Sequence, residues 1–246
     1  MSASPRFEEL DFRRTPLGDL ILRRRTLLSL GGREIHEILL GDEYLMSSLF
    51  TEVEQALSRL GLAAARDSFP DTPLDVIVGG LGLGYTARAA LEEEAVSSLV
   101  VIDYLEPVIE WHREGKVPLG PVVTGDPRCR LLAGDFFRLA LRKDSGRGFE
   151  DDDPTRKYHA VLLDIDHSPD KLLSETHADF YCREGLRTLA SQLHPGGVFA
   201  LWSDDPPEDA FLRALGEVFS TCDSHVVSFH NPLQEKDSAS TVYVAR

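Results

Sequence analysis

A cluster of glycines directly follows a short apolar run in the first third of the chain. Its members are Gly79, Gly80, Gly82 and Gly84. The apolar run is Leu74–Val78, and a helix-compatible stretch, Thr86–Glu94, comes after the glycines. Glycine has no Cβ and tolerates positive φ, so a strand, a glycine turn and a helix allow the backbone to approach a nucleotide-like ligand. The spacing therefore predicts a ligand-binding loop, although an ordinary tight turn would use the same residues.

Acidic side chains recur at the ends of the next three predicted strands. They are Asp103, Asp135, Asp164 and Asp166. Open α/β sheets bind ligands at the carboxyl ends of their strands, so we expect these acids to lie beside the glycine turn. At the tip of the second strand, Asp103 is placed to bind ribose hydroxyls. In the segment Gly134-Asp135-Phe136, the acid could bond an adenine amine and the ring could flank it; a helix N-cap with a core phenylalanine is the alternative.

The segment Asp164-Ile-Asp-His-Ser-Pro169 is the most specific indication of catalytic chemistry in the sequence. In an extended strand end, Asp164 and Asp166 project to the same side. Two close carboxylates attract a cation and can orient and deprotonate an amine, and His167 adds a second base near neutral pH. The alternative is a turn whose side chains cap their own backbone.

Apolar runs alternate with helical segments from about Leu74 to the end of the chain. The predicted parallel strands are Leu74–Val78, Ser98–Asp103, Cys129–Leu132, Tyr158–Asp164 and Val198–Trp202. The predicted helices are Thr86–Glu94, Glu106–Glu114, Phe136–Arg142, Ala178–Leu193 and Pro207–Phe219. Pro195-Gly-Gly197 is expected to end the fourth helix, and the runs Ser224–Phe229 and Ser240–Ala245 to form an antiparallel hairpin. Residues 71–246 thus read as a Rossmann-like α/β domain with a parallel sheet covered on both faces and a C-terminal antiparallel hairpin.

The first 70 residues differ from the rest. The sequence pattern predicts a small antiparallel lid with short strands at Leu17–Arg25 and Arg33–Leu40. It also predicts a helix at Leu49–Leu60. We therefore expect a small N-terminal strand and helix lid region, residues 1–70, beside the catalytic domain.

Composition limits the partners. Apolar residues make up 42% and charged residues 27% of 246, as in a globular protein with an ample core. The formal charge of −15 argues against nucleic acid and suits a small, even cationic, substrate. We expect no membrane segment and, because no basic-then-apolar leader is visible, a cytoplasmic protein. The three cysteines lack metal-ligand spacing, so we expect reduced thiols and no metal.

With these residues in view, the chain resembles the spermidine synthase (polyamine aminopropyltransferase) family, a branch of the class I methyltransferase fold. The family's glycine loop looks like Gly79–Gly84, its ribose-binding acid falls on Asp103, and its adenine-contacting Gly-Asp on Gly134-Asp135. Its D-S-S-D-P segment aligns with Asp164–Ser168, which places the catalytic aspartate on Asp164. The resemblance implies decarboxylated AdoMet, or AdoMet, as donor substrate, and a homodimer by analogy only.

Two departures from the family are visible. The second aspartate of the catalytic segment, which grips the amine, falls on His167, so Asp166 would have to substitute from one position earlier. The lid motif D-E-F-x-Y-H-E has its Tyr, His and Glu replaced by Met46, Ser47 and Ser48. The donor half of the site is retained and the acceptor half is altered, which argues against putrescine as the acceptor.

The leading hypothesis is an aminopropyltransferase that uses a small amine other than simple putrescine. An AdoMet-dependent N-methyltransferase of a small amine is the close alternative, and a non-catalytic nucleoside-binding module is the second. A dehydrogenase is disfavoured because the C-terminal hairpin and the Asp164 segment have no role in it. In the enzyme hypothesis Asp164 acts as base or amine orienter, and Asp166 and His167 are its partners.

Overall fold

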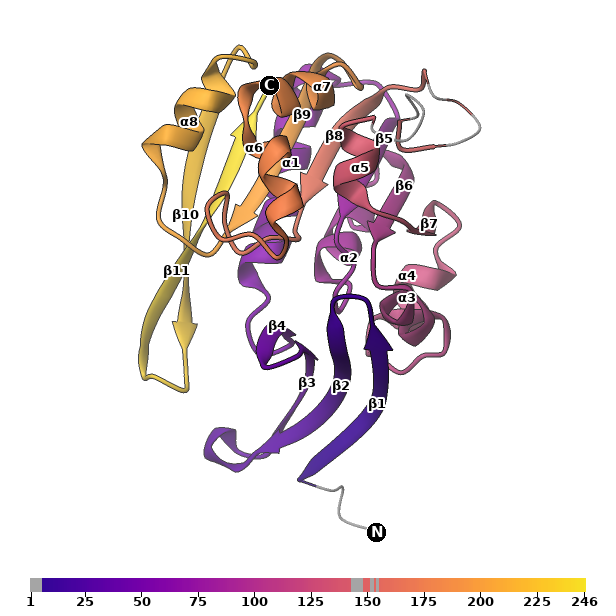
Figure 1. Ribbon diagram of the computed structural model, residues 1–246, viewed down its shortest axis with the longest axis vertical. Coiled ribbons are helices and arrows are strands. Elements are labelled where there is room, and N and C mark those ends of the chain that lie inside the picture. Colours follow the sequence, from indigo (N-terminus) through magenta and orange to yellow (C-terminus); the bar gives the residue numbers. More distant parts are fainter. Residues whose placement is uncertain (1–5, 143–147, 151–152, 154) are drawn as a thin grey trace.

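A seven-stranded sheet forms the centre of the computed structural model, which describes residues 6–142, 148–150, 153 and 155–246 (Figure 1). Its strand order is β10-β11-β9-β8-β5-β6-β7. The strands are β5 (Leu74–Gly79), β6 (Val96–Asp103), β7 (Cys129–Ala133), β8 (Tyr158–Leu163), β9 (Leu193–Ser203), β10 (Cys222–Asn231) and β11 (Lys236–Ala245). Strands β5 to β9 pair in parallel, whereas β11 pairs antiparallel with both β9 and β10. The predicted α/β class with a C-terminal antiparallel hairpin is confirmed.

Strand order reverses at β5, which lies between β6 and β8. The crevice outside the carboxyl ends of the strands at such a switch point is where open α/β sheets bind ligands. Gly79 pairs with Ile102 of β6 and with Leu163 of β8, so the end of β5 adjoins both neighbouring strand ends. The glycine turn, Asp103 and Asp164 therefore meet at one place.

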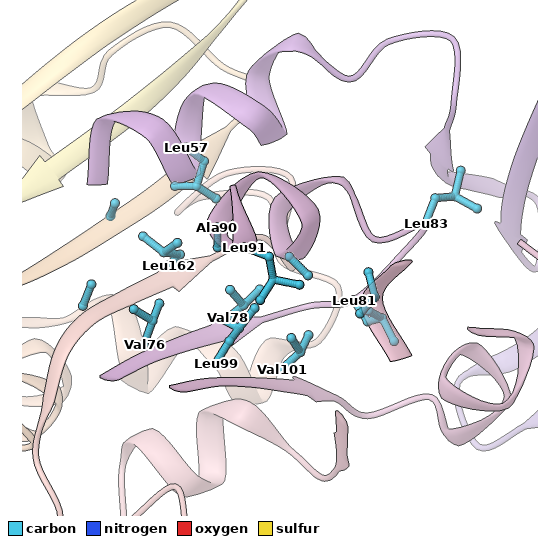
Figure 2. Packing of buried hydrophobic residues seen from close by; sticks show 14 of the residues in the cluster. Leu57, Val76, Val78, Leu81, Leu83, Ala90, Leu91, Leu99, Val101 and Leu162 are labelled. Carbon is cyan, nitrogen blue, oxygen red and sulfur yellow. The ribbon is translucent and has the colours of Figure 1, made fainter. Parts of the chain in front are cut away.

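Helices cover both faces of this sheet. They are α1 (Glu52–Ser68), α2 (Tyr85–Leu91), α3 (Glu106–Arg113), α4 (Gly120–Gly125), α5 (Phe136–Ala140), α6 (Ala178–Tyr181), α7 (Arg183–Ala190) and α8 (Asp209–Gly216), with short 3-10 turns η1 (Leu28–Leu30) and η2 (Glu175–His177). Side chains alternate along β5: Val76 and Val78 pack with Leu57 of α1 and Ala90 of α2 (Figure 2), while Ile77 joins the core on the opposite face. Burial on both faces explains why this strand is apolar throughout.

A four-stranded antiparallel sheet precedes the main sheet and lies below the carboxyl ends of its parallel strands in Figure 1. Its strands, in order, are β1 (Phe7–Thr15), β2 (Gly18–Leu27), β3 (Arg33–Leu40) and β4 (Glu43–Ser47). The strands predicted at Leu17–Arg25 and Arg33–Leu40 correspond to β2 and β3. Strands β1 and β4 were not predicted, because each is short of buried apolar side chains.

The small sheet is fastened to the main domain through β1. Asp11 accepts a hydrogen bond from the indole Nε1 of Trp111 at 2.8 Å and one from Lys116 Nζ at 3.1 Å. Trp111 lies on α3 and is fully buried. Arg13 adds an ion pair to Glu110 of the same helix at 3.6 Å.

Two local predictions were wrong. The helix predicted over Ala178–Leu193 is broken at Cys182, whose ψ of 165° is extended; Gly185 comes so close to the Asp179 carbonyl that a Cβ there would lie 2.2 Å from its oxygen. The predicted turn Pro195-Gly-Gly197 lies inside β9, where the pairing with β8 shifts register between Leu193 and Val198. Such an irregularity accommodates proline and glycine within a strand.

No helix in the described part of the chain has the length and apolar character that crossing a membrane requires.

Candidate active site

A cavity of about 250 Å³ opens between the main sheet and the N-terminal sheet. One part of its wall comes from the strand ends and their turns, and we call it the sheet side. The sheet side comprises Gly80, Gly82, Asp103, Asp135, Phe136 and Asp164. Another part, the lid side, comes from the N-terminal sheet, the loop after β1 and α1. The lid side comprises Leu17, Ile38, Leu45, Met46 and Glu54.

The glycine turn is shaped so that only glycine fits its cavity-facing positions. Gly80 has a φ of +94°, and a Cβ there would lie 2.0 Å from the carbonyl oxygen of Asp164. Gly82 has a φ of +48°, and its Cβ would lie 2.6 Å from Met46 Sδ. L-amino acids with side chains rarely adopt such φ values, so the backbone favours glycine at both positions, and at Gly80 the neighbouring backbone also leaves no space for a Cβ.

The remaining predicted glycines support the site without lining the cavity. Gly84 caps the N-terminus of α2 in a left-handed conformation. A Cβ on Gly79 would lie 2.7 Å from the Phe136 ring, so this glycine lets the ring pack against the end of β5. Gly134 precedes the Asp135 turn, and a Cβ there would make an ordinary contact with the Leu139 side chain at 3.5 Å.

Asp103 holds the glycine turn. Its Oδ2 accepts the Leu81 N–H at 2.9 Å, and its Oδ1 accepts the Leu105 N–H at 2.8 Å. Burial raises the pKa of this carboxyl, an effect that the backbone N–H groups partly offset. An ionised carboxylate offers about four acceptor positions, so lone pairs remain for a ligand in the cavity.

Asp135 and Phe136 combine the two alternatives that the sequence leaves open. The Asp135 carboxylate caps α5 by accepting the Arg138 N–H at 3.1 Å. Phe136 is 2% exposed and packs on Phe149 and Phe180. Both residues nevertheless line the cavity. Asp135 is thus a helix cap and Phe136 a core side chain, and each also forms part of the cavity wall.

Asp164 faces the cavity at the end of β8. Its Oδ2 accepts a hydrogen bond from the hydroxyl of Thr86 at 2.5 Å. Burial raises the pKa of this carboxyl to about 6, although the Thr86 hydrogen bond acts in the opposite direction. A carboxylate with a pKa nearer neutrality is a more effective proton acceptor than an ordinary aspartate.

Glu54, which the sequence analysis did not select, lies on the lid side of the same cavity. It stands one helical turn before Ser58, whose hydroxyl donates to the Thr86 carbonyl at 2.7 Å. Burial first, and the neighbouring Asp164 second, raise the pKa of Glu54 to about 8. No sequence motif marks this residue; the only available signal is its i, i+4 spacing from Ser58 on an amphipathic helix.

Asp166 and Asp164 do not share one face. The strand ends at Leu163, so the alternation of side chains does not continue through the next residues. The Asp166 carboxylate is fully buried outside the cavity lining, where it accepts from Leu173 N at 2.8 Å and Tyr181 Oη at 2.9 Å and pairs with His177 Nδ1 at 2.8 Å. His177 does line the cavity and stacks on Phe137 with ring centroids 3.8 Å apart. Asp166 therefore braces the cavity wall through His177.

His167 and Trp202 complete the wall near the Asp164 turn. His167 lies in the cavity lining, as the predicted role beside Asp164 requires. Trp202 at the end of β9 also lines the cavity and is half-buried. Within the described residues, no group of three or more His, Cys, Asp or Glu side chains could hold a metal ion.

The three altered lid residues have different positions. Met46 lines the cavity, and its Sδ accepts the Leu83 N–H at 3.0 Å, which ties the N-terminal sheet to the glycine turn. Ser48 Oγ accepts the His36 N–H at 2.9 Å, and Ser47 Oγ accepts the Leu49 N–H at 3.2 Å. Both serines lie outside the cavity lining.

Comparison with curated proteins agrees with this geometry. The chain is 29% identical to polyamine aminopropyltransferase 2 of Pseudomonas aeruginosa over 228 residues, which are 85% of this chain and 60% of that protein. It is also 28% identical over 127 residues to the polyamine aminopropyltransferase of Pyrobaculum islandicum, covering 52% of this chain and 40% of the relative. The chain is therefore similar in sequence to polyamine aminopropyltransferases. It spans about 60% of the length of the first relative, and no family model matches it.

Solved structures share the fold of this chain. Spermidine synthase from Thermotoga maritima superimposes with a TM-score of 0.70 at 15% identity, over 96% of this chain and 72% of that one. Human methyltransferase-like protein 13, solved with SAH, gives a TM-score of 0.56 at 18% identity, over 79% of this chain and 82% of that one. The predicted likeness to the class I methyltransferase fold is therefore confirmed.

Proposed function

We propose that this protein transfers an aminopropyl group from decarboxylated AdoMet to a small amine. The observation that carries the proposal is the position of Asp164: a carboxylate with a raised pKa faces one cavity together with the glycine turn and Asp103. The homology to polyamine aminopropyltransferases supports the same activity. Because the sulfonium donor is already electrophilic, the protein has to align the reactants, exclude water and accept one proton.

The residues of the sheet side fit the donor. At Gly80 and Gly82 the absence of a Cβ keeps the backbone open to a nucleoside, and the free lone pairs of Asp103 suit ribose hydroxyls. Asp135 is assigned to the adenine amine, with Phe136 beside the ring. These assignments, with Gly79, Gly84 and Gly134 in support of the turns, are proposals.

In the reaction, the amine nitrogen forms a bond to the aminopropyl carbon next to the sulfonium, and the carbon–sulfur bond breaks with its electron pair going to sulfur. Methylthioadenosine leaves. The attacking nitrogen releases one proton, and Asp164 is placed to accept it. The Thr86 hydroxyl fixes the Asp164 carboxylate through the 2.5 Å hydrogen bond. His167 is proposed to assist at the cavity wall, and Asp166 to position His177 rather than to touch the amine.

The acceptor is proposed to be a small amine other than simple putrescine. Met46 presents a thioether to the cavity where the family motif has a tyrosine, and Ser47 and Ser48 bond to backbone instead. The contacts to the diamine that this motif implies are thus absent from the cavity lining among the described residues. A cytoplasmic location and a homodimer stay predictions, and light scattering of the purified chain tests the second.

Donor selection tests the proposal directly. Thermal unfolding should be measured with AdoMet, decarboxylated AdoMet and methylthioadenosine, followed by a panel of amines with product detection. We expect decarboxylated AdoMet and methylthioadenosine to raise Tm, and methylthioadenosine to form when an amine is added. Stabilisation by AdoMet alone would instead support N-methyl transfer. Donor binding without turnover across the amine panel would support a non-catalytic nucleoside-binding module.

A further inference from the structure

Two carboxylates from different elements face the same cavity. Glu54 comes from α1 and Asp164 from the end of β8. After burial, the charge of Asp164 is the next cause that raises the pKa of the Glu54 carboxyl. Among the described residues, no basic side chain contributes to the pKa of either carboxyl. Burying two like charges together is unfavourable unless a proton or a cation is bound between them.

A chain of hydrogen bonds fixes the geometry of this pair. Ser58 lies four residues after Glu54, on the same face of α1. Its hydroxyl donates to the Thr86 carbonyl at 2.7 Å, and the Thr86 hydroxyl donates to Asp164 at 2.5 Å. Ser58 and Thr86 are buried, so α1, α2 and the end of β8 are held together at this point. The relative position of the two carboxylates is therefore set by the core rather than by a surface loop.

The rest of the lid side is apolar. Leu17, Ile38, Leu45 and Met46 contribute methyl, methylene and thioether groups to the lining. Glu54 is the one ionisable group on this side within the described residues. An aliphatic chain can pack on this wall, while the charged end of the molecule requires the carboxylates.

We propose that Glu54 binds the ammonium group of the acceptor together with Asp164, and so replaces the amine contact that His167 and Asp166 do not supply. This inference rests on the proposed function and adds the residue that holds the acceptor. A primary amine arrives as a cation, is positioned between the two carboxylates, and passes one proton to Asp164 before its nitrogen attacks. Glu54 remains beside the nitrogen and stabilises the positive charge that develops on it.

The test compares Glu54→Gln with Glu52→Gln. Glu52 is on the same helix but exposed, so it is a matched control for the loss of one carboxylate. Binding of n-butylamine, putrescine and spermidine should be measured by calorimetry with the full chain saturated with methylthioadenosine. We expect at least one amine to bind the wild type, its Kd to rise at least tenfold in Glu54→Gln, and Glu52→Gln to stay within twofold. Methylthioadenosine itself should bind all three proteins equally, which shows that each is folded.

The outcomes separate this inference from the proposed function. Equal amine binding by Glu54→Gln and Glu52→Gln, or a wild type that binds methylthioadenosine but none of the amines, would overturn the role of Glu54. Failure of the wild type to bind methylthioadenosine would overturn the proposed function and this inference with it. In steady-state assays, Glu54→Gln should raise the amine KM at least tenfold while kcat changes less, because Asp164 still accepts the proton.

Discussion

The two sides of the cavity are built in opposite ways. The sheet side comes from consecutive turns at the ends of β5, β6, β7 and β8, and backbone conformation decides its shape: Gly80 and Gly82 must have positive φ, and Asp103 braces them through backbone N–H groups. The lid side is assembled from the loop after β1, from β3 and β4, and from α1, and its one ionisable group within the described residues is Glu54. Backbone constraints can thus preserve the shape of a binding loop while the side chains of the facing wall differ in chemistry.

The largest effect is expected on the sheet side, from Gly80→Ala. The added Cβ would lie 2.0 Å from the Asp164 carbonyl oxygen at a φ of +94°, so the turn must shift. We expect a loss of about 3 kcal/mol or more in the free energy of unfolding, a fall in Tm of roughly 6–12 °C, and loss of methylthioadenosine binding.

Gly115→Ala is the matched control for that substitution. Gly115 also has a positive φ, +68°, but nothing lies within 4 Å of an added Cβ. It should cost only about 1–2 kcal/mol and leave ligand binding unchanged. If thermal unfolding shows equal losses for both variants, steric closure at Gly80 is not what shapes the sheet side.

This asymmetry also explains what the sequence could reveal. The glycine turn, Asp103 and Asp164 are each read from a short local pattern, since a parallel strand is apolar throughout and its ligand-facing residue follows immediately. Glu54 reaches the cavity only because α1 packs on α2. The contact that joins the two helices is the hydrogen bond from Ser58 to Thr86, residues that are 28 positions apart in the chain. No local pattern encodes such a contact.

The missed elements have similar causes. Strand β1 alternates exposed and partly buried residues in a thin sheet, so it lacks the apolar run that marks the central strands. The prediction that Asp166 lies beside Asp164 requires an extended backbone, but the strand ends at Leu163. Where a strand stops cannot be read from the alternation of its residues.

The next effect concerns the attachment of the lid side. Asp11→Ala removes the acceptor of the Trp111 indole N–H and a partner of Lys116. We expect about 2 kcal/mol of destabilisation, because a buried N–H is left without a partner, and faster proteolysis within the N-terminal sheet. Asp19→Ala is the control, since this exposed residue of β2 should change stability by no more than about 0.5 kcal/mol. Equal protease sensitivity of the two variants would contradict the role of Asp11 in docking the sheet.

The smallest effect is a pH dependence of stability. The pKa of Glu54 is about 8 in the folded chain, against 4.5 for an ordinary glutamate. Burial is the main cause of this rise, the charge of Asp164 is the second, and Glu52 adds to it. Tyr85 also lies close enough for its pKa to be raised by Glu54. Between these values the folded state binds more protons than the unfolded state, so the free energy of unfolding falls as the pH rises. The stability contribution is fully present below pH 4.5 and is lost as the pH rises through 8.

Glu54→Gln should remove this fall, so between pH 7 and 8 the free energy of unfolding of the variant should change by about 1 kcal/mol less than that of the wild type. Urea unfolding at each pH measures it, and Glu52→Gln should keep the wild-type slope. A Glu54→Gln variant with the wild-type slope would show that Glu54 has an ordinary pKa and does not interact with Asp164.

In the proposed reaction, Asp164 accepts the proton of the attacking amine in a cavity that binds an adenosyl donor. Formation of methylthioadenosine from decarboxylated AdoMet and an amine, measured for the wild type and for Asp164→Asn at equal occupancy of the donor site, tests it most directly. We expect turnover by the wild type, a loss of about 10²- to 10⁴-fold in the variant, and equal binding of methylthioadenosine by both. Equal rates of methylthioadenosine formation by the two proteins would contradict it.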